Sequence, residues 1–520
     1  MPAPPPWRPR ANPWAIAIVV TLAAFMEILD STIVNVALPH IAGSMGASND
    51  ESTWTLTSYL VANGIVLPIS AWFGAVLGRK RYFLICIVAF TLFSFLCGIA
   101  TNLWELILFR LLQGFFGGGL QPNQQAILLD TFPASQRGRA MSVVAVATVI
   151  APVLGPTLGG VITDSASWRW LFLLNVPVGA LCFVGVAALV EDPPWAMRTT
   201  RRIDTIGLGL IALGIGCLQV TLDRGEDADW FASNFVRLFA VLSALGLIGA
   251  TAWLVWARHP VVNVRVLRDR NFAVGCLMIS ATMAVLYSSA VILPLLAQSV
   301  LGYTSTLAGY LLSPGAVALL LLIPVAARLM TLVQTRVLVF AGFVLLGAGL
   351  LYSQRLTPDI SFDNLMTMRI AQTVGLAFLF VPISTISYTT LPAAQRADGV
   401  ALNVMFRNIA GSIGIALSTA LVTSGTQVRM AHLAAHLTPL DPAYVQMLHN
   451  HVQTLIAMGH SAQSATGTAM ALIYRNLRIQ ASVLAYADVF QLSALLAFAA
   501  APFAFLFTGA KASMRPGAGH

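Results

Sequence analysis

The hexapeptide FPASQR at residues 132–137 returns as LPAAQR at residues 391–396, a shift of 259 residues (396 − 137). The same shift relates three further pairs: Arg110 with Arg369, Gln113 with Gln372, and Gly155 with Gly414. Both copies stand among long apolar runs. Such a duplication predicts a membrane protein of two homologous helical bundles, with a substrate site between them near the middle of the membrane. The pattern is typical of a transporter.

The composition points to lipid rather than water around the chain. Of its 520 residues, 58% are hydrophobic and only 9% are charged, which leaves too few charges for a soluble surface. A spanning helix needs roughly 20 apolar residues. Because the runs are continuously apolar and do not alternate, they predict helices rather than a barrel. We place about fourteen of them: 14–38, 53–76, 82–100, 104–129, 139–163, 169–190, 204–222, 234–257, 272–299, 307–330, 336–353, 364–388, 399–424 and 485–508.

The net charge of +9 is explained by topology. When the spans alternate from a cytoplasmic start, the basic clusters gather on one side and the acidic loops on the other. This distribution follows the positive-inside rule and predicts that both termini are cytoplasmic. We therefore expect no nucleic-acid partner. The N-terminus lacks a cleavable signal pattern, so the first span is expected to be retained.

The repeat divides the chain into three blocks. Residues 1–190 form a first six-helix bundle, residues 191–271 hold two additional spans without a mate in the repeat, and residues 272–520 form a second six-helix bundle. A long outward-facing loop, 425–484, interrupts the second bundle. Apolar residues at helical spacing within it predict two amphipathic helices, which could dock a partner or cap the exit.

Other chemistries have little support. The five cysteines fall inside apolar runs and are expected to be packing residues. His432 and His436 have the i, i+4 spacing of metal ligands, but solvated surface histidines are favoured. No loop offers a metal set, a nucleophile constellation or a phosphate-binding Gly-x-x-x-x-Gly-Lys. We therefore expect no enzyme activity, no metal and no cofactor, with a proton gradient as the energy source.

Two acids in the first span carry the functional hypothesis. Glu27 and Asp30 lie three residues apart, hence on one helical face, and a carboxylate in a bilayer costs several kcal/mol (about +2.5 to +3.5 for Asp). Arg110 in span four lies at a similar depth, roughly 10 Å from the outer face. A switchable Asp30–Arg110 pair with Glu27 nearby would couple transport to protons. The alternative is a static salt bridge that holds two helices. Asp30 shifted by 259 falls on Ser289, so proton handling is expected in the first bundle only.

Span five carries a run of small residues and prolines, APVLGPTLGG at 151–160. Proline kinks a helix and glycine permits close packing, so this run predicts an outer gate. The residues expected to form it are Gly155, Pro156, Gly159 and Gly160.

These stretches resemble the motifs of the fourteen-span drug:proton antiporters of the major facilitator superfamily. Leu29–Pro39 (LDSTIVNVALP) resembles the first-span signature, Leu108–Gly114 (LFRLLQG) the span-four motif and Gly155–Gly160 (GPTLGG) the antiporter motif. Residues 168–177 (WRWLFLLNVP) and the Asn403–Gly414 run also fit. The resemblance covers nearly the whole chain and is nearest to the EmrB/QacA type, on the EmrB side. It implies an all-α major facilitator fold with fourteen transmembrane helices.

One motif departs from the family pattern. The loop after span two keeps only its basic half, Gly78, Arg79 and Arg81, while the acidic position is Ala75 and the first arginine position is Val76. We expect the retained residues to take part in inner gating, but without the family's charge-linked latch.

The resemblance further implies efflux of lipophilic drugs driven by proton entry, from the inner membrane of a Gram-negative bacterium, together with a periplasmic adaptor and an outer-membrane channel. The alternative is a proton-coupled carrier of one metabolite, such as a fatty acid, a siderophore or an aromatic acid. Buried Arg407 would attract an anionic or electron-rich substrate, or else hydrogen-bond to carbonyls of neighbouring helices. The polar residues expected to line the cavity are Asn35, Gln113, Gln121, Asn123, Asn403 and Arg407.

Overall fold

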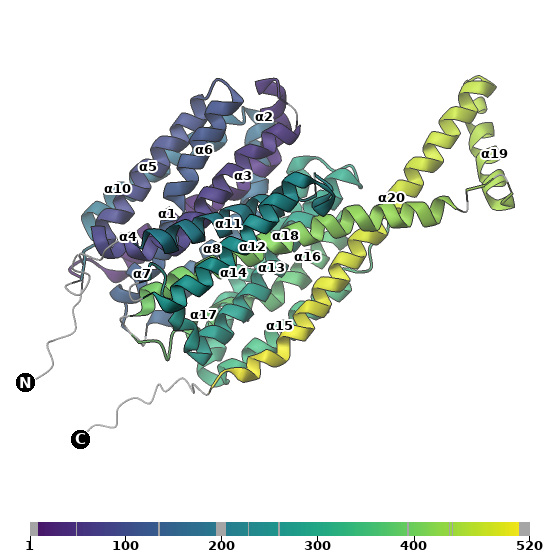
Figure 1. The fold of residues 1–520 in the computed structure, drawn as a ribbon. Helices are drawn as coiled ribbons and strands as arrows, with labels where there is room; N and C mark the ends of the chain where they lie inside the picture. The colour runs from purple at the N-terminus through teal and green to yellow at the C-terminus, as the bar shows by residue number, and fades with distance from the viewer. Residues whose placement is uncertain are drawn as a thin grey trace, which may run out of the picture.

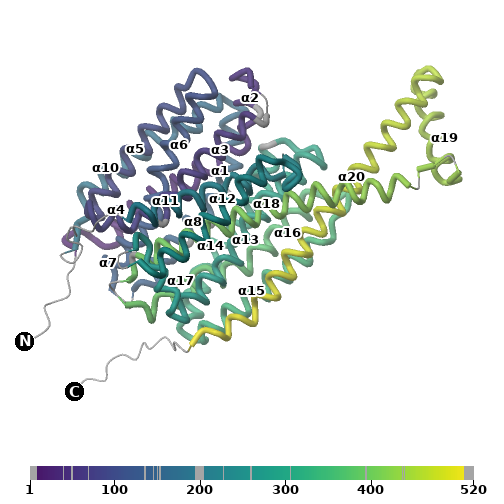
Figure 2. Tube along the Cα trace, viewed as in Figure 1, coloured from purple at the N-terminus to yellow at the C-terminus, as the bar shows by residue number. Residues whose placement is uncertain are grey.

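The structure is a computed structural model that describes residues 9–47, 49–133, 136–193, 204–226, 228–257, 260–392, 395–435, 437–438 and 440–508. These residues form helices and short connections, and no strand occurs among them. Two groups of long helices lie side by side and a helical hairpin projects from one end (Figure 1). The Cα trace in Figure 2 follows the same arrangement. We call the end where α1 and α13 begin the inner end, and the opposite end the outer end.

The first bundle is made from the helices before residue 190. The apolar runs predicted from the sequence all lie on helices, and several of the spans, such as 53–76, 104–129 and 169–190, are made of consecutive helices. Its elements are α1 (Pro13–Ile33), η1 (Val34–Ala37), α2 (Leu38–Met45), α3 (Asn49–Val66), η2 (Leu67–Ile69), α4 (Ser70–Leu77), α5 (Arg79–Ile99), α6 (Leu103–Gly117), α7 (Leu120–Thr131), α8 (Arg137–Ser165), α9 (Arg169–Leu173) and α10 (Asn175–Leu189).

The rest of the chain supplies the two additional helices and the second bundle. Their elements are α11 (Thr205–Arg224), η4 (Trp230–Ala232), α12 (Asn234–Trp256), η5 (Val264–Arg268), α13 (Arg270–Ser299), α14 (Ser305–Leu332), α15 (Thr335–Tyr352), α16 (Phe362–Ala377), α17 (Phe380–Ser387), α18 (Arg396–Ala434), α19 (Pro442–Ala457), α20 (Ala462–Ala500) and η7 (Ala501–Leu506).

Twelve spans among the described residues are long and apolar enough to cross a membrane, and the bent pair Glu51–Val66 and Ser70–Leu77 (59°) makes up to thirteen. Helix α8 covers the run predicted at 139–163 but is not among them. The chain is therefore a multi-pass all-α membrane protein, while the count of fourteen spans stays a prediction.

The two additional helices pack as a pair, and only α12 is mainly exposed. Gly214 of α11 and Gly246 of α12 allow their backbones to touch, since a Cβ on Gly246 would lie 2.5 Å from the nitrogen of Gly214. Helix α11 also contacts α3 of the first bundle and α18 of the second. Arg224 at its outer end donates a hydrogen bond to Thr53 of α3 (2.5 Å). Helix α11 therefore contacts both bundles, whereas α12 is the more exposed helix of the pair.

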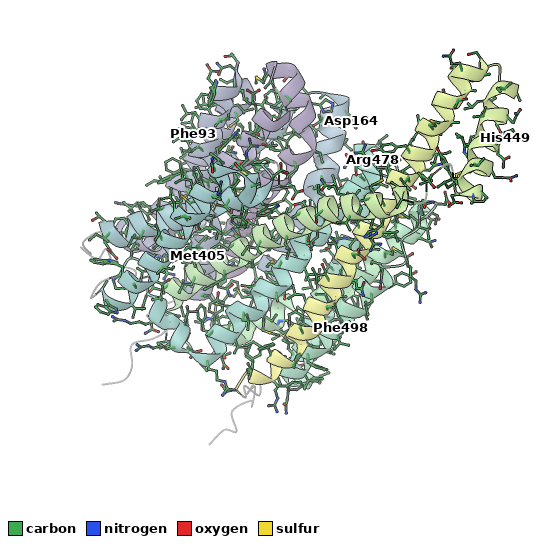
Figure 3. All side chains as sticks on the ribbon, turned by 45° about the vertical axis from the view of Figure 1, so that its right-hand side comes forward. Phe93, Asp164, Met405, His449, Arg478 and Phe498 are labelled. Carbon is green, nitrogen blue, oxygen red and sulfur yellow. The ribbon has the colours of Figure 1, made fainter. Side chains whose placement is uncertain are left out.

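The segment predicted as a long loop, 425–484, is mostly helical. Helix α18 continues past the expected end of its span to Ala434, and α20 begins at Ala462 and runs without interruption into the last span. Between them lies α19, the amphipathic helix expected there, which packs on α20 through Leu455, Ala465 and Ala469. An Arg429–Asp488 ion pair joins α18 to α20. His449 on α19 and Arg478 on α20 mark this hairpin in Figure 3. His436 lies outside the described residues.

The bundles touch near the outer end and in the middle. At the outer end, α8 packs against α14, and Thr157 Oγ1 donates a hydrogen bond to the carbonyl of Gly309 (2.8 Å). A Cβ on Gly309 would lie only 2.5 Å from Cα of Thr157, so this approach requires glycine. Deeper in the molecule, α18 contacts α7 and η2. All five cysteines are buried and unpaired, as expected for packing residues.

Candidate functional site

Asp30 is held inside the first bundle by donors from two other helices. Its Oδ2 accepts a hydrogen bond from Arg110 Nη1 of α6 at 2.6 Å, and both side chains are fully buried. Its Oδ1 accepts from Gln113 Nε2 (3.1 Å) and from Asn175 Nδ2 of α10 (2.7 Å). The Asn175 amide also donates to Ser94 of α5 (2.9 Å). The contact predicted from the equal depth of Asp30 and Arg110 is present.

Arg110 is enclosed on its remaining sides. Its Nε donates to the backbone carbonyl of Thr55 (3.2 Å), and Nη1 also donates to Gln113 Oε1 (2.9 Å). The guanidinium carbon lies 4.1 Å from the ring centroid of Tyr59 and 5.5 Å from that of Phe172, within cation–π range. Ion pairing with planar hydrogen bonds and ring stacking are the contacts that allow an arginine to be buried.

Glu27 is buried one helical turn further in, with polar but uncharged neighbours in contact. Its Oε1 accepts hydrogen bonds from Asn63 Nδ2 (2.9 Å) and from the Tyr59 hydroxyl (3.2 Å), both on α3. Its Oε2 accepts one bond, from Gln121 Nε2 of α7 (2.5 Å). No described ion pair involves Glu27, so the two acids on one helical face have different environments.

Tyr59 joins the two acidic clusters. Its hydroxyl donates to Glu27, while its ring lies under the guanidinium that holds Asp30. Gly114 of α6 allows this position, because a Cβ there would lie 2.3 Å from the Tyr59 carbonyl oxygen. Tyr59 therefore contacts both clusters. A change in the charge of Asp30 or of Glu27 alters the surroundings of a side chain that also contacts the other cluster.

Gln121 carries the first bundle's polar network to the second bundle. Its Oε1 accepts a hydrogen bond from Arg407 Nη2 of α18, and both side chains are buried. Within the described part of the chain, Gln121 is the one side chain that accepts a hydrogen bond from Arg407. The hydrogen-bond chain Glu27–Gln121–Arg407 thus runs from the first bundle to the second.

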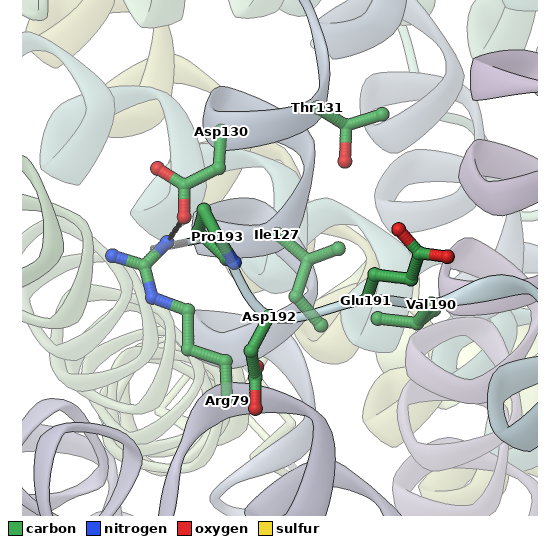
Figure 4. Close-up of a pocket in the computed structure, with 8 residues that line it drawn as sticks. All are labelled: Arg79, Ile127, Asp130, Thr131, Val190, Glu191, Asp192 and Pro193. Carbon is green, nitrogen blue, oxygen red and sulfur yellow. Dashed lines mark hydrogen bonds and ion pairs between the residues drawn. The ribbon is translucent and has the colours of Figure 1, made fainter. Parts of the chain in front are cut away.

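At the inner end, Arg79 has an acidic partner, although the loop motif has alanine at its acidic position, residue 75. Arg79 forms an ion pair with Asp130, the single acid of α7 (Figure 4), and also donates to the carbonyl of Ala126 (3.0 Å). Lys80 N donates to Asp192 Oδ1 (2.9 Å) just after α10. We call Gly78, Arg79, Asp130 and Asp192 the inner latch. The expectation that a charge-linked latch is absent is therefore wrong: its acids come from other helices, not from position 75.

The glycines of span five lie where α8 crosses α1. A Cβ on Gly155 would lie 2.2 Å from Thr32 Oγ1, and one on Gly159 would lie 2.6 Å from the carbonyl oxygen of Ile33. Gly160 is buried and Pro156 half-buried on the same helix. Their packing near the outer contact fits the predicted gate, whose opening stays a prediction.

Several predicted cavity residues lie elsewhere. Gln113 belongs to the Asp30 cluster, and Asn123 donates to the carbonyl of Arg79 at the inner latch (2.9 Å). Asn403 is buried beside Cys276 of α13, and Asn35 is exposed after α1. The inner-gate residue Arg81 is likewise exposed. Of the six predicted cavity residues, Gln121 and Arg407 are the pair that meets between the bundles.

Sequence reasoning missed three of the residues that hold the acids: Tyr59, Asn63 and Asn175. The first two had a detectable signal, since they lie four apart in an apolar span and so share a face. Asn175 was inside the WRWLFLLNVP motif, but nothing in the motif indicates that its amide contacts Asp30.

The comparisons with known proteins agree with this architecture. The Major Facilitator Superfamily matches residues 20–201 and 276–438, and the chain belongs to this family. It is thus a membrane transporter and not an enzyme. The interval between the two matched segments holds α11 and α12.

Curated relatives cover nearly the full length. The chain is 36% identical over 482 residues to the multidrug export protein EmrB of Haemophilus influenzae, covering 92% of each. It is 32% identical over 503 residues to the fatty acid resistance protein FarB of Neisseria gonorrhoeae, covering 96% of this chain and 97% of FarB. The human organic anion transporter MFSD10 (TETRAN) has the same fold, with a TM-score of 0.58, 14% identity, and coverage of 94% of this chain and all of that one.

Proposed function

We propose that this chain exports lipophilic small molecules in exchange for protons. The observation that carries the proposal is the fully buried Asp30–Arg110 pair, with Glu27 a second buried acid on the same helix. Buried charges in a membrane bundle are costly and mark ion pathways. The relatives named multidrug export proteins supply the direction and the substrate class.

In the proposed cycle, Asp30 alternates between two partners, Arg110 and a proton. A proton that reaches Asp30 neutralises the carboxylate and weakens its hold on Arg110; the bundles then rock, and the proton leaves on the other side. The substrate occupies the space between the bundles near Gln121 and Arg407.

The charge of this region sets the substrate class. Arg369 and Arg407 of the second bundle are buried, and no described ion pair supplies either with a carboxylate. Neutral or weakly anionic aromatic compounds are therefore favoured over dications. Divalent quaternary amines are expected to be poor substrates, and strong resistance to them on expression would contradict this assignment.

The test of proton exchange uses everted vesicles that carry Asp30→Asn. Drug-induced proton movement is expected to disappear while drug binding remains, because the amide keeps the shape and loses the titrating group. Ser289→Asn is the matched control at the equivalent position of the second bundle, and it should retain proton movement. Unchanged drug-induced proton movement in Asp30→Asn would reject Asp30 as the coupling residue.

A second candidate, export of a single fatty acid, is favoured by the relative named fatty acid resistance protein and by the buried cation Arg407. A susceptibility panel in an efflux-deficient host separates the two. Protection against long-chain fatty acids alone supports the narrow carrier, and protection against several unrelated lipophilic compounds supports the multidrug exporter.

We further propose an inner-membrane location with cytoplasmic termini, which places the hairpin of α18, α19 and α20 in the periplasm against an adaptor that leads to an outer-membrane channel. The hairpin exposes apolar side chains, including Tyr474 (59% exposed). A photo-crosslinker at Tyr474 should capture a periplasmic adaptor protein, while one at Trp256 of α12 (86% exposed) should not. Equal capture from both positions would contradict docking on the hairpin.

A further inference from the structure

Gln121 lies between an acid of the first bundle and a cation of the second. Its Nε2 donates to Glu27 Oε2 (2.5 Å), and its Oε1 accepts from Arg407 Nη2. An ionised carboxylate can only accept hydrogen bonds, and a guanidinium can only donate them. These two partners therefore fix which way the amide points.

We propose that Gln121 is the positioning residue that makes the contact between the bundles depend on the protonation of Glu27. This inference rests on the proposed proton exchange, and it assigns Gln121 a role in transmitting the proton's arrival to Arg407. Gln121 itself neither gains nor loses a proton.

The mechanism follows from the hydrogen-bond capacity of one amide. On Glu27, Oε1 already accepts two bonds, whereas Oε2 accepts one and has room for a proton. A proton arriving from water converts Glu27 Oε2 into an O–H donor, which then faces another donor, Gln121 Nε2. The Gln121 amide can accept this hydrogen bond only by turning over. Its Oε1 then faces Glu27 and its Nε2 faces Arg407. Arg407 then meets a donor and loses its acceptor.

The consequence is a contact that exists for one charge state only. A buried donor without a partner costs about 1–3 kcal/mol, and more when it is charged. Arg407 Nε already has no hydrogen-bond partner in the described part of the chain. Loss of the Gln121 carbonyl thus favours a state in which α18 moves away from α7 and Arg407 meets water or substrate. The proton drives separation of the bundles at mid-membrane.

The other titratable groups around Glu27 do not replace it as the switch. Tyr59 of α3 touches Glu27, and Tyr287 of α13 lies within electrostatic range of Glu27 and Arg407. Tyrosine and arginine titrate far above neutral pH. Tyr388, after α17, lies within electrostatic range of Arg407.

Asp30 is the other acid in reach of this network. It is linked to Glu27 through Tyr59 and Arg110, but its oxygens are held by Arg110, Gln113 and Asn175 and make no bond to Gln121. Glu27 is therefore the one carboxylate whose charge Gln121 detects directly.

The experiment measures the outer contact as a function of pH in proteoliposomes. Spin labels are placed at exposed Ser165 of α8 and Leu307 of α14, next to the Thr157–Gly309 contact. The five native cysteines are buried, so labelling is directed to the introduced ones. In the otherwise unaltered protein, acidification should change the ratio of short to long distances by at least about fivefold.

Two substitutions test the role of the amide. Gln121→Met fills the same space without hydrogen bonds. Glu27→Gln removes the titrating group and leaves Gln121 intact. This variant therefore tests the same pH response if a substitution at position 121 prevents folding. Each should reduce the pH response to less than about twofold. Gln124→Met is the matched control: Gln124 lies on the same helix and, among the described residues, donates only to Thr21 (3.0 Å). It should retain the full response.

The outcomes separate this inference from the proposed function. If Gln121→Met or Glu27→Gln keeps the full pH response, the inference is overturned, because Gln121 is then a packing contact. Drug-dependent proton uptake is measured in the same unaltered protein. If drug-dependent proton uptake is absent, the proposed function is contradicted. If proton uptake is present but the pH response survives Gln121→Met, only the inference about Gln121 is contradicted.

Discussion

Arg369 donates a hydrogen bond to Ser289 (3.0 Å) in the position where, in the other bundle, Arg110 holds Asp30. Each pair is 80 residues apart in the chain, and each arginine also donates to the glutamine three residues on. The duplicated bundles thus keep the cation and the amide but only one keeps the acid. Only the first bundle therefore has a titratable carboxyl group at this position.

Ser289→Asp should stabilise the protein. Arg369 is fully buried, and its Nε and Nη2 have no hydrogen-bond partner among the described residues. A carboxylate at 289 would add a charge-assisted hydrogen bond, about 1.5–3 kcal/mol. The melting temperature in detergent should therefore rise. Ser289→Asn, of similar size but uncharged, is the control; an equal rise with Asn would show that size rather than charge is responsible.

Tyr59→Phe and Tyr59→Leu should separate the two roles of that side chain. Phenylalanine keeps the ring under Arg110 and loses the donor to Glu27, with a cost of about 1 kcal/mol. Leucine loses both and should cost more, because the cation–π contact adds about 0.5–2 kcal/mol. Unfolding in denaturant measures both. Equal losses for the two substitutions would mean that the ring contributes nothing to holding Arg110.

The inner latch should behave as a coupled pair. Arg79 and Asp130 are each about one-fifth exposed, so their interaction is expected to be modest, roughly 0.2–1 kcal/mol. A double-mutant cycle with Arg79→Gln and Asp130→Asn should return a coupling of that size, which decreases with added salt. Additive effects would show that the contact with the Ala126 carbonyl, rather than the charge of Asp130, holds Arg79.

Gly309→Ala should impair closure of the outer contact. The added Cβ would meet Cα of Thr157 at 2.5 Å, so α8 and α14 must separate and transport should slow strongly. Gly209→Ala in α11 is the matched control. Its Cβ has open space, and it should stabilise the helix by up to about 1 kcal/mol. Transport rates and melting temperatures of the two variants are compared, and full transport by Gly309→Ala would contradict a gating role for this contact.

Much of the fold and part of the site could be predicted from local sequence. Helix positions follow from apolar length, and the meeting of Asp30 with Arg110 follows from equal depth on two spans. The hairpin was only half anticipated: its amphipathic residues predicted helices, but helices α18 and α20 also continue through the expected span ends, where no proline interrupts them.

The sequence alone determined that two bundles repeat, that the first carries both acids on one helical face, and that the second has serine where the first has Asp30. These features depend on composition, spacing and helical period, which are local. Only the tertiary structure decided that Gln121 bridges Glu27 to Arg407 and that Arg79 pairs with Asp130. Contacts between helices depend on their rotation, tilt and closeness, which the packing of the whole bundle sets and no single span encodes.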